Sequence, residues 1–132
     1  MTNNIEKFLQ SPEFAVIGAS SNRNKYGNKV LRCYMQHQMK VYPVHPSEEE
    51  VEGLTVFSSV MELPSDVKSI SIITPPQITE EVVNEAIKRG IKNIWMQPGA
   101  ESQQAIQNCL NHQINVIAKG PCILVVLGFH EE

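Results

Sequence analysis

Short, continuous apolar runs alternate along the chain with longer segments in which apolar residues recur at helical spacing. A parallel strand buried on both faces gives a continuous apolar run, and a helix packed on a sheet is apolar along one face. The alternation therefore predicts an α/β fold: a single doubly wound, mainly parallel five-stranded sheet of Rossmann-like type. The predicted strands are residues 14–17, 40–44, 69–74, 93–96 and 115–118.

Three segments between these strands place their apolar residues on one helical face and predict helices. They span residues 28–38, 79–89 and 101–112. Gly90 follows Lys88-Arg89 as a C-terminal cap does, and Thr79 is expected to be the N-cap of the second of these helices.

Residues 46–63 have a less regular pattern. The acidic run 48–50 indicates a solvated turn or a short helix rather than a binding feature. Residues 55–57 predict a short extended piece, and residues 60–63 predict one helical turn before Pro64.

Composition sets limits on the class of protein. With 132 residues, 42% of them hydrophobic, the chain is long enough for one domain over residues 1–132 with its own core. A net charge of -3 disfavours nucleic acid or an anionic membrane surface as the main partner. The first residues do not resemble a signal peptide, and the apolar run at 122–127 is too short to span a bilayer, so neither secretion nor membrane insertion is expected.

The three cysteines, Cys33, Cys109 and Cys122, are far apart and include no CxxC pair. This spacing favours neither a disulfide framework nor a zinc site and predicts a reduced, cytoplasmic setting. Cys33 and Cys109 lie on apolar helical faces, which predicts that both are packing residues.

In a doubly wound sheet, ligands bind beyond the carboxyl ends of the strands. The first of these ends runs through a small, polar, basic loop into a helix, which brings backbone N–H groups and the positive end of a helix dipole together. An anion, and a phosphate group in particular, is therefore expected here. The predicted phosphate-binding residues are Gly18, Ala19, Ser20, Ser21, Arg23, Lys25, Tyr26 and Gly27.

The kind of phosphate compound follows from what this loop lacks. A GxGxxG dinucleotide fingerprint fails at two positions, because Ser20 and Arg23 stand where the second and third glycines belong. The second strand ends in Val44-His45-Pro46 and carries no acid to bind free ribose hydroxyls. His45 would tolerate a phosphorylated ribose, which an acid would repel. Coenzyme A, with its 3′-phosphate, pyrophosphate and pantetheine arm, therefore fits better than NAD.

Several other residues at strand ends allow two interpretations. Pro75-Pro76 after Thr74 either form a stiff, donor-poor wall for adenine or pantetheine, or simply end the strand before a helix. Gln97 either lies over the pantetheine or thiol end, or belongs to a plain turn. Tyr26 either stacks on adenine or packs the loop onto the sheet.

Cys122 is the tempting nucleophile, but packing is favoured over a ligand contact, and a ligand contact over a catalytic thiolate. A mixed disulfide with coenzyme A is a further possibility to check. The four histidines form no arrangement with it that is typical of nucleophilic catalysis, and His37 and His112 are expected near helix C-termini. No carboxylate pair for acid/base work and no metal-ligand cluster is recognisable.

At this point the combined pattern resembles the CoA-binding protein family, whose members look like the N-terminal CoA-binding domain of the succinyl-CoA synthetase alpha subunit. The matching pieces, in the family's order, are residues 16–21, 25–30, 41–46, 74–76, 85–92 and 120–122. The resemblance implies that residues 18–21 and 23–27 hold the CoA phosphates. It also implies that Val44, His45 and Pro46 border the adenosine, that Thr74, Pro75 and Pro76 line the opposite side, and that Cys122 lies near the end of the last strand.

Two departures limit the resemblance. Many small family members have Asn where this chain has His45, which affects the ribose contact. The synthetase also needs a phosphorylated histidine in a second domain and an ATP-handling partner, so ligase activity is not carried over.

The sequence therefore predicts a protein that binds coenzyme A or an acyl-CoA at the C-terminal edge of the sheet, without catalysis of its own. Two alternatives remain: an NAD(P)-binding enzyme or redox sensor, and an interaction subunit of an acyl-CoA synthetase. The expected partners are the small-molecule ligand and a second protein chain or another copy of this one, with no nucleic acid and no membrane.

Overall fold

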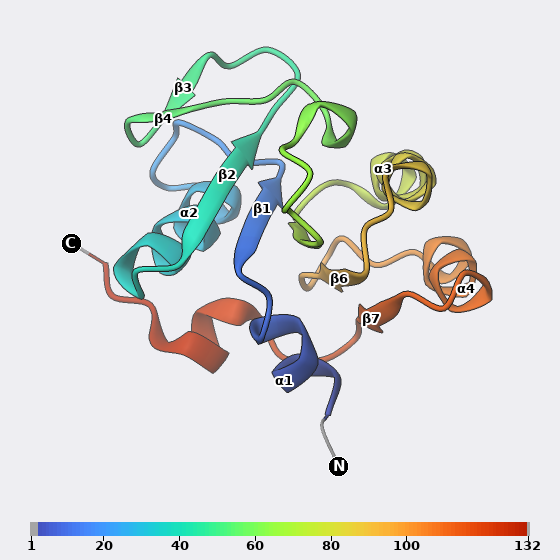
Figure 1. Ribbon diagram of the computed structural model, residues 1–132. Helices are drawn as coiled ribbons and strands as arrows, with labels where there is room; N and C mark the ends of the chain where they lie inside the picture. Colours follow the sequence, from blue (N-terminus) through green and yellow to red (C-terminus); the bar gives the residue numbers. More distant parts are fainter. Residues whose placement is uncertain (1–2, 132) are drawn as a thin grey trace.

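Five parallel strands form a twisted sheet at the centre of the molecule (Figure 1). The computed structural model describes residues 3–131. The strands are β1 (Glu13–Ile17), β2 (Lys40–Val44), β5 (Ser69–Ile72), β6 (Asn93–Met96) and β7 (Asn115–Ile117), in the order β2-β1-β5-β6-β7. The predicted Rossmann-like α/β fold is confirmed, with the third and fifth strands ending slightly earlier than expected.

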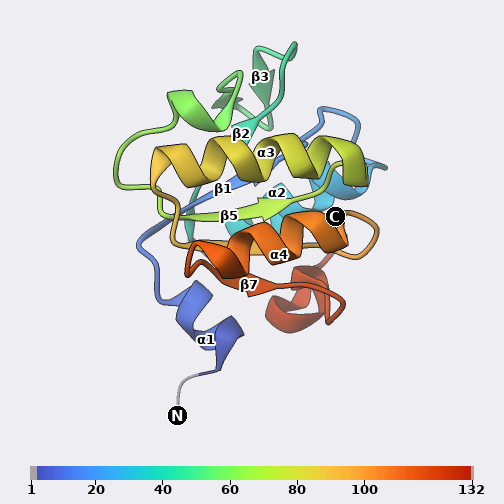
Figure 2. The same ribbon diagram turned by 90° about the vertical axis from the view of Figure 1, so that its right-hand side faces the viewer.

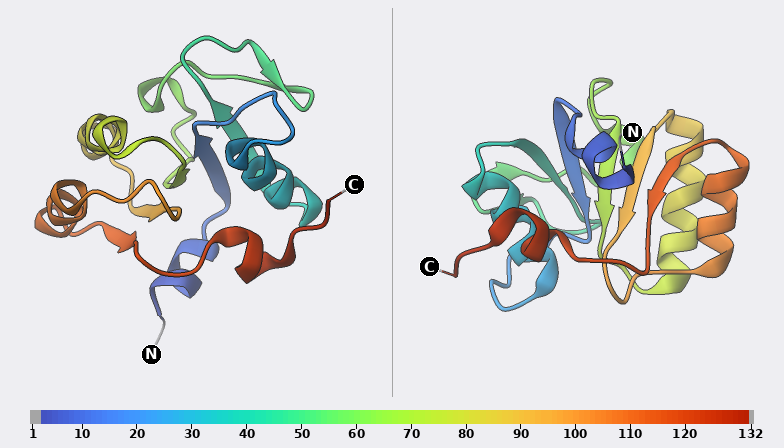
Figure 3. Two further views of the ribbon diagram at one scale, coloured as in Figure 1. Left: turned by 180° about the vertical axis from the view of Figure 1, so that it is seen from behind. Right: turned by 90° about the horizontal axis from the view of Figure 1, so that it is seen from below.

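Helices cover both faces of this sheet (Figures 2 and 3). Helices α3 (Pro76–Arg89) and α4 (Gln103–Asn111) lie side by side on one face. The opposite face carries α1 (Asn4–Leu9), α2 (Tyr26–Gln36) and the short π-helical segment η2 (Leu124–Gly128). Across residues 3–131, no helix is long and apolar enough to cross a membrane.

Each face has its own apolar core. Val83 and Ala86 of α3 pack with Ile70, Ile72 and other sheet residues on one side. On the other side, Phe8, Phe14, Tyr34 and Trp95 meet in tilted and edge-on ring contacts at centroid distances of 5.1–5.5 Å. Burial on both faces explains why β1 and β6 are apolar along most of their length. The central strand β5 is also fully buried but alternates serine with isoleucine, and its Ser71 hydroxyl is hydrogen-bonded to the Tyr34 hydroxyl at 2.6 Å.

The prediction that Thr79 is the N-cap of the helix over residues 79–89 is wrong. Helix α3 begins three residues earlier, at Pro76, with Pro75 as its N-cap. Proline suits the first helical position because its missing N–H would have no helical partner there. Thr79 is instead buried inside the first turns, and its hydroxyl lies 2.8 Å from that of Thr74. The bond links the helix to the end of β5.

The acidic run forms no helix: Glu49 lies in an exposed bend, as the solvated-turn alternative predicts, and Glu50 begins a strand. Strands β3 (Glu50–Val51) and β4 (Leu54–Thr55) form a separate antiparallel hairpin. Its two-residue turn, Glu52-Gly53, has positive φ at both positions (50° and 80°), which is typical of a type I′ turn. Val51 is buried against the α2 side of the core and anchors the hairpin. The single helical turn predicted next is present as η1 (Val60–Glu62).

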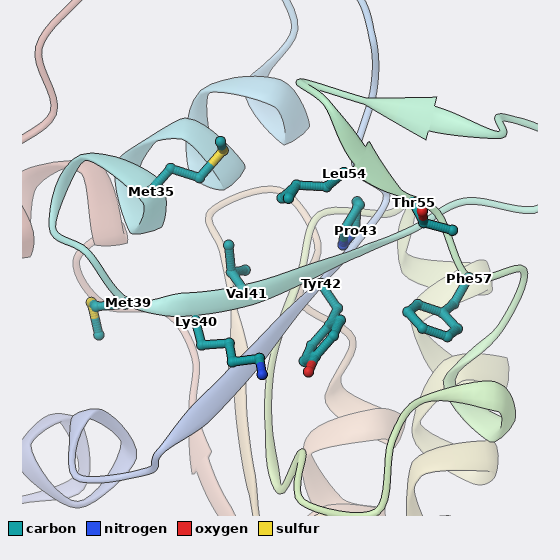
Figure 4. A pocket seen from close by; sticks show the side chains of 9 residues that line it. All are labelled: Met35, Met39, Lys40, Val41, Tyr42, Pro43, Leu54, Thr55 and Phe57. Carbon is teal, nitrogen blue, oxygen red and sulfur yellow. The ribbon is translucent and has the colours of Figure 1, made fainter.

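The outer edge of β2 is partly covered. Phe57 donates its N–H to the Pro43 carbonyl and accepts the N–H of His45, both at 3.0 Å. Next to these bonds, an apolar pocket of about 360 Å³ lies between β2, the end of α2 and β4 (Figure 4). Its lining residues are Met35, Met39, Lys40, Val41, Tyr42, Pro43, Leu54, Thr55 and Phe57.

Two glycines permit close backbone approaches at the end of β1. Gly18 has a φ of +97°, and a Cβ there would lie 2.6 Å from the Ile73 carbonyl oxygen. A Cβ on Gly27, in the first turn of α2, would lie 2.0 Å from the carbonyl oxygen of Gly18. Both distances are far shorter than a carbon–oxygen contact allows, and the obstructing atoms are backbone atoms. Gly27 therefore lets the helix reach the end of β1, and Gly18 lets the chain turn there beside Ile73 with a positive φ.

Replacing Gly27 with alanine should push α2 away from Gly18. We expect Gly27→Ala to lower the free energy of unfolding by about 2–4 kcal/mol, as overpacking against backbone does. Chemical denaturation measures this. Gly120→Ala is the matched control, because a Cβ at Gly120 would meet only the Ala118 carbonyl oxygen, at 3.9 Å. Equal stability of the two variants would contradict the expected clash.

Candidate functional site

The order of the strands reverses beside β1. The chain crosses from β1 to β2 on one side and then returns to β5 on the other. Open α/β sheets bind ligands at such a switch point, beyond the carboxyl ends of the strands. The loop after β1, here called the phosphate loop (residues 18–25), lies at this point.

Two cavities open along this edge of the sheet. The first, of about 240 Å³, lies beyond β1 and β2 toward α3. The second, of about 550 Å³, lies beyond β5 and β6. Thr74 lines both, so the two cavities adjoin at the end of β5. The first is lined by Ile17, Gly18, Val44, Pro46, Ser58, Ser59, Val60, Thr74, Ile78, Glu81, Val82 and Glu85, and the second by Tyr26, Ile73, Thr74, Pro75, Pro98, Gly99, Ala100 and Cys122.

The phosphate loop is held by backbone carbonyl groups. At its start, the N–H groups of Gly18 and Ala19 donate to the Val44 carbonyl at 3.0 and 3.3 Å. Further on, Asn28 Nδ2 donates to the Ser20 carbonyl at 2.8 Å. The first helical turn of α2 has no capping side chain at its N-cap, Lys25. The positive end of the α2 dipole is therefore directed at the loop without a side-chain acceptor of its own.

A buried arginine supports the loop from behind. Arg32 is 4% exposed and donates through Nη2 to the Arg23 carbonyl at 3.0 Å. Its Nε donates to Asn28 Oδ1 at 2.6 Å, and its Nη1 pairs with Glu131 at 2.8 Å. Its guanidinium lies over the Phe129 ring, 5.1 Å from the centroid. Sequence reasoning missed Asn28 and Arg32, although two polar residues one helical turn apart beside an apolar face were a usable signal.

Acidic side chains contact the loop from the neighbouring segment. The Ser21 N–H donates to Glu48 Oε2 at 2.8 Å, so the acidic run is part of the site and not simply solvated. The Ser21 hydrogen bonds, and after them the charge of Lys25, lower the pKa of Glu48. Glu52, at the tip of the hairpin, accepts from Asn28 at 3.0 Å and lies 3.5 Å from Arg23 Nε. Arg23, predicted to hold phosphate, is thus paired with a carboxylate.

His45 is oriented by its own loop. Its Nδ1 accepts the N–H groups of Ser47 and Glu48, each at 3.1 Å. An Nδ1 atom that accepts hydrogen bonds carries no proton, so the ring presents Nε2–H as its remaining donor. The side chain is half-buried beside the first cavity's residues Val44 and Pro46.

Tyr26, Gln97 and the C-terminal segment meet at the second cavity. Gln97 is fully buried, and its Oε1 accepts the Tyr26 hydroxyl at 3.2 Å and the Ile123 N–H at 2.9 Å. Gln97 Nε2 is buried without a partner among the described residues. Burial, followed by the neighbouring Cys122 thiol, raises the pKa of Tyr26. Tyr26 therefore packs the loop onto the sheet, and it also lines the cavity.

The two prolines after β5 have different positions. Pro75 lines the second cavity, whereas Pro76 is the exposed first residue of α3. Pro76 therefore fits the interpretation that the pair ends the strand before a helix, and the contact of Pro75 with adenine or pantetheine stays a prediction. Cys122 is half-buried in the second cavity and lies beyond β7, in the segment leading to η2, so its expected place near the end of the last strand is only approximate.

Seven of the predicted site residues line these cavities. They are Gly18, Tyr26, Val44, Pro46, Thr74, Pro75 and Cys122. Ala19, Gly27 and Gln97 are buried beneath the surface, and Ser20, Ser21, Arg23, Lys25, His45 and Pro76 lie outside the cavity linings. Ser58, Ser59, Glu81 and Glu85 line the first cavity and were missed, because nothing local in their sequence indicates it.

Comparisons with known proteins agree with this geometry. Residues 12–128 match the sequence profile of a family described as CoA binding domain. The match covers most of the chain and includes both cavities and the phosphate loop. The chain belongs to this CoA-binding domain family.

The relatives include long CoA ligases or synthetases, of which this chain matches one part, and a protein that it covers almost completely. The chain is 34% identical over 91 residues to the alpha subunit of an ADP-forming acetate–CoA ligase II from Pyrococcus furiosus, covering 68% of this chain and 20% of that subunit. A conserved hypothetical protein of the same organism has a similar structure, with a TM-score of 0.82, 38% identity and coverage of 86% of this chain and 97% of that one. An acetyl-coenzyme A synthetase 1 of Ca. Korarchaeum cryptofilum superposes with a TM-score of 0.76 at 25% identity, covering 87% of this chain and 27% of the synthetase. The chain spans about a fifth of the length of the curated ligases it matches.

The three thiols should differ in reactivity. Cys33 and Cys109 are fully buried, and burial raises the pKa of each to about 11. Cys122 is half-buried in the second cavity. We expect a thiol reagent such as dithionitrobenzoate to label one cysteine rapidly in the native protein and all three after unfolding. Cys122→Ser should abolish the rapid phase, whereas Cys109→Ser should leave it unchanged; the reverse result would contradict the cavity assignment.

Proposed function

We propose that the chain binds coenzyme A or an acyl-CoA across the two cavities, with the pyrophosphate on the phosphate loop. The observation that carries this is the arrangement of the cavities on either side of one strand end, with Thr74 shared by both. The adenosine lies in the first cavity, between Val44 and Pro46 on one side and Thr74 on the other. The pantetheine arm enters the second cavity, past Pro75 toward Cys122.

The electrostatics of the loop suit such a ligand. The positive end of α2 is not capped by a side chain and lies behind the loop. His45 accepts the Glu48 N–H through Nδ1 at 3.1 Å, and the charge of Lys25 is among the causes that lower the pKa of Glu48. These two side chains are the groups that would receive the 3′-phosphate, through the Lys25 ammonium and His45 Nε2–H.

The same features disfavour NAD. The acid that binds ribose hydroxyls in dinucleotide-binding proteins stands at the end of the second strand, where this chain has His45. The glycine that permits close packing of the helix is Gly27, nine positions after Gly18, which gives a longer loop than the dinucleotide fingerprint.

Binding without catalysis is supported by the chemistry of the second cavity. Its ionisable groups are the Cys122 thiol and the Tyr26 phenol, whose pKa is raised above its ordinary value. A general base is most effective when its pKa is near the working pH, and a phenol of raised pKa is far from it.

A second candidate function follows from the comparisons. The relative from Pyrococcus furiosus is the alpha subunit of a ligase. In this alternative, the chain supplies the CoA site to an acyl-CoA synthetase whose ATP-binding part is a separate chain. Ligase turnover that appears only when such a chain is added would favour it.

Calorimetric titration with coenzyme A, 3′-dephospho-CoA and NAD tests the main proposal. We expect coenzyme A to bind most tightly, 3′-dephospho-CoA more weakly, and NAD weakest, because the site is arranged for a 3′-phosphate and lacks a ribose-binding acid. NAD binding with no measurable affinity for coenzyme A would overturn the proposal.

Removing the charge of Lys25 should reveal the 3′-phosphate contact. We expect Lys25→Gln to weaken coenzyme A binding about five-fold and to change 3′-dephospho-CoA binding much less, as loss of one charge-assisted contact does. Lys92→Gln is the matched control, because Lys92 is exposed and directly precedes β6, at the opposite edge of the sheet. An equal loss for both ligands would place Lys25 away from the 3′-phosphate.

A further inference from the structure

A carboxylate from the chain itself occupies a donor of the phosphate loop. The Ser21 N–H donates to Glu48 Oε2 at 2.8 Å, a length typical of a charge-assisted hydrogen bond. This is the interaction that a phosphate oxygen would make with the same N–H. Glu48 therefore acts as an internal anion at the predicted phosphate site.

The position of Glu48 is set by the segment that follows β2. The Ser47 and Glu48 N–H groups both donate to His45 Nδ1, which folds this segment back toward the loop. Beyond it, the Glu49 carbonyl accepts the Val56 N–H at 3.0 Å, which ties the segment to the β3–β4 hairpin. Hydrogen bonds thus hold the backbone on either side of Glu48, whereas the bond from Glu48 to Ser21 lies at the exposed surface.

The neighbouring acid Glu52 has a different role. Its carboxylate accepts from the Asn28 side chain and pairs with Arg23, and no backbone N–H of the loop is among its partners. Glu52 and Asn28 can keep these contacts while a phosphate occupies Ser21. Of the two acids, Glu48 is the one that competes with a ligand.

We propose that the Glu48 carboxylate occupies the place of a ligand phosphate on the Ser21 N–H, and that a ligand binds by displacing it. The inference rests on the proposed function. Displacement breaks the Glu48–Ser21 bond and brings like charges together, so Glu48 lowers the affinity for any ligand that places a phosphate on the Ser21 N–H. A pantetheine compound without phosphates does not meet this barrier.

The experiment compares Glu48→Gln with Glu49→Gln in titrations with coenzyme A and with pantetheine. Both variants remove one negative charge, but the Glu49 side chain is exposed at the neighbouring position and is not bound to the loop. We expect Glu48→Gln to bind coenzyme A about three- to ten-fold more tightly than the unmodified protein, as removal of one competing charge-assisted contact allows. Glu49→Gln should change the affinity much less, and pantetheine should bind all three proteins equally.

The outcomes separate this inference from the proposed function. Unchanged or weaker coenzyme A binding by Glu48→Gln, with its thermal unfolding midpoint preserved, would overturn the displacement. An equal gain in Glu49→Gln would overturn it as well, because the effect would then be one of net charge. Failure of the unmodified protein to bind coenzyme A would contradict the proposed function. In that case, the displacement is tested with inorganic pyrophosphate as the ligand. Equal pyrophosphate affinity of the unmodified protein and Glu48→Gln would overturn the inference separately.

Discussion

The contact between Gly27 and the Gly18 carbonyl is the constraint on which the site depends. Because Gly27 has no side chain, the first turn of α2 rests directly on the Gly18 carbonyl at the end of β1. The helix dipole, the loop amides and the strand ends then converge within one small region. Neither cavity would adjoin the loop in the same way if the helix stood even one methyl group farther out.

Arg32 makes this region rigid from the inside. Moving a guanidinium out of water is costly, and here its donors are matched by the Asn28 side chain, the Arg23 carbonyl and Glu131. The bond to Arg32 also lowers the pKa of Glu131. The phosphate loop, the body of α2 and the last residues of the described chain are therefore parts of one network. A disturbance of the C-terminal segment would reach the loop through a single side chain.

The accuracy of the sequence-based predictions varies with how local the signal is. Strands such as β1 and β6 are continuous apolar runs because they are buried on both faces, so their positions were predictable. Gly18, Val44 and Thr74 followed from the rule that ligands lie beyond strand ends, and all three line the first cavity. The β3–β4 hairpin was missed because two-residue strands carry almost no periodic pattern. The role of Glu48 depends on how the chain folds back after β2, and no local pattern expresses that.

The proline in β2 bears on how this sheet behaves toward other strands. Along a strand, the backbone N–H and carbonyl groups of alternate residues point to the same side. The backbone groups of Pro43 and His45 point away from β1, because they are bonded to Phe57. The backbone groups of Val41 point the same way. Pro43 has no N–H to offer, and the Phe57 bridge already uses its carbonyl. Within β2, Val41 is therefore the one residue whose outward N–H and carbonyl are both left unused by Phe57. A foreign strand would find too few bonds to add itself here, which protects the sheet from lateral growth and amyloid-like stacking at this edge.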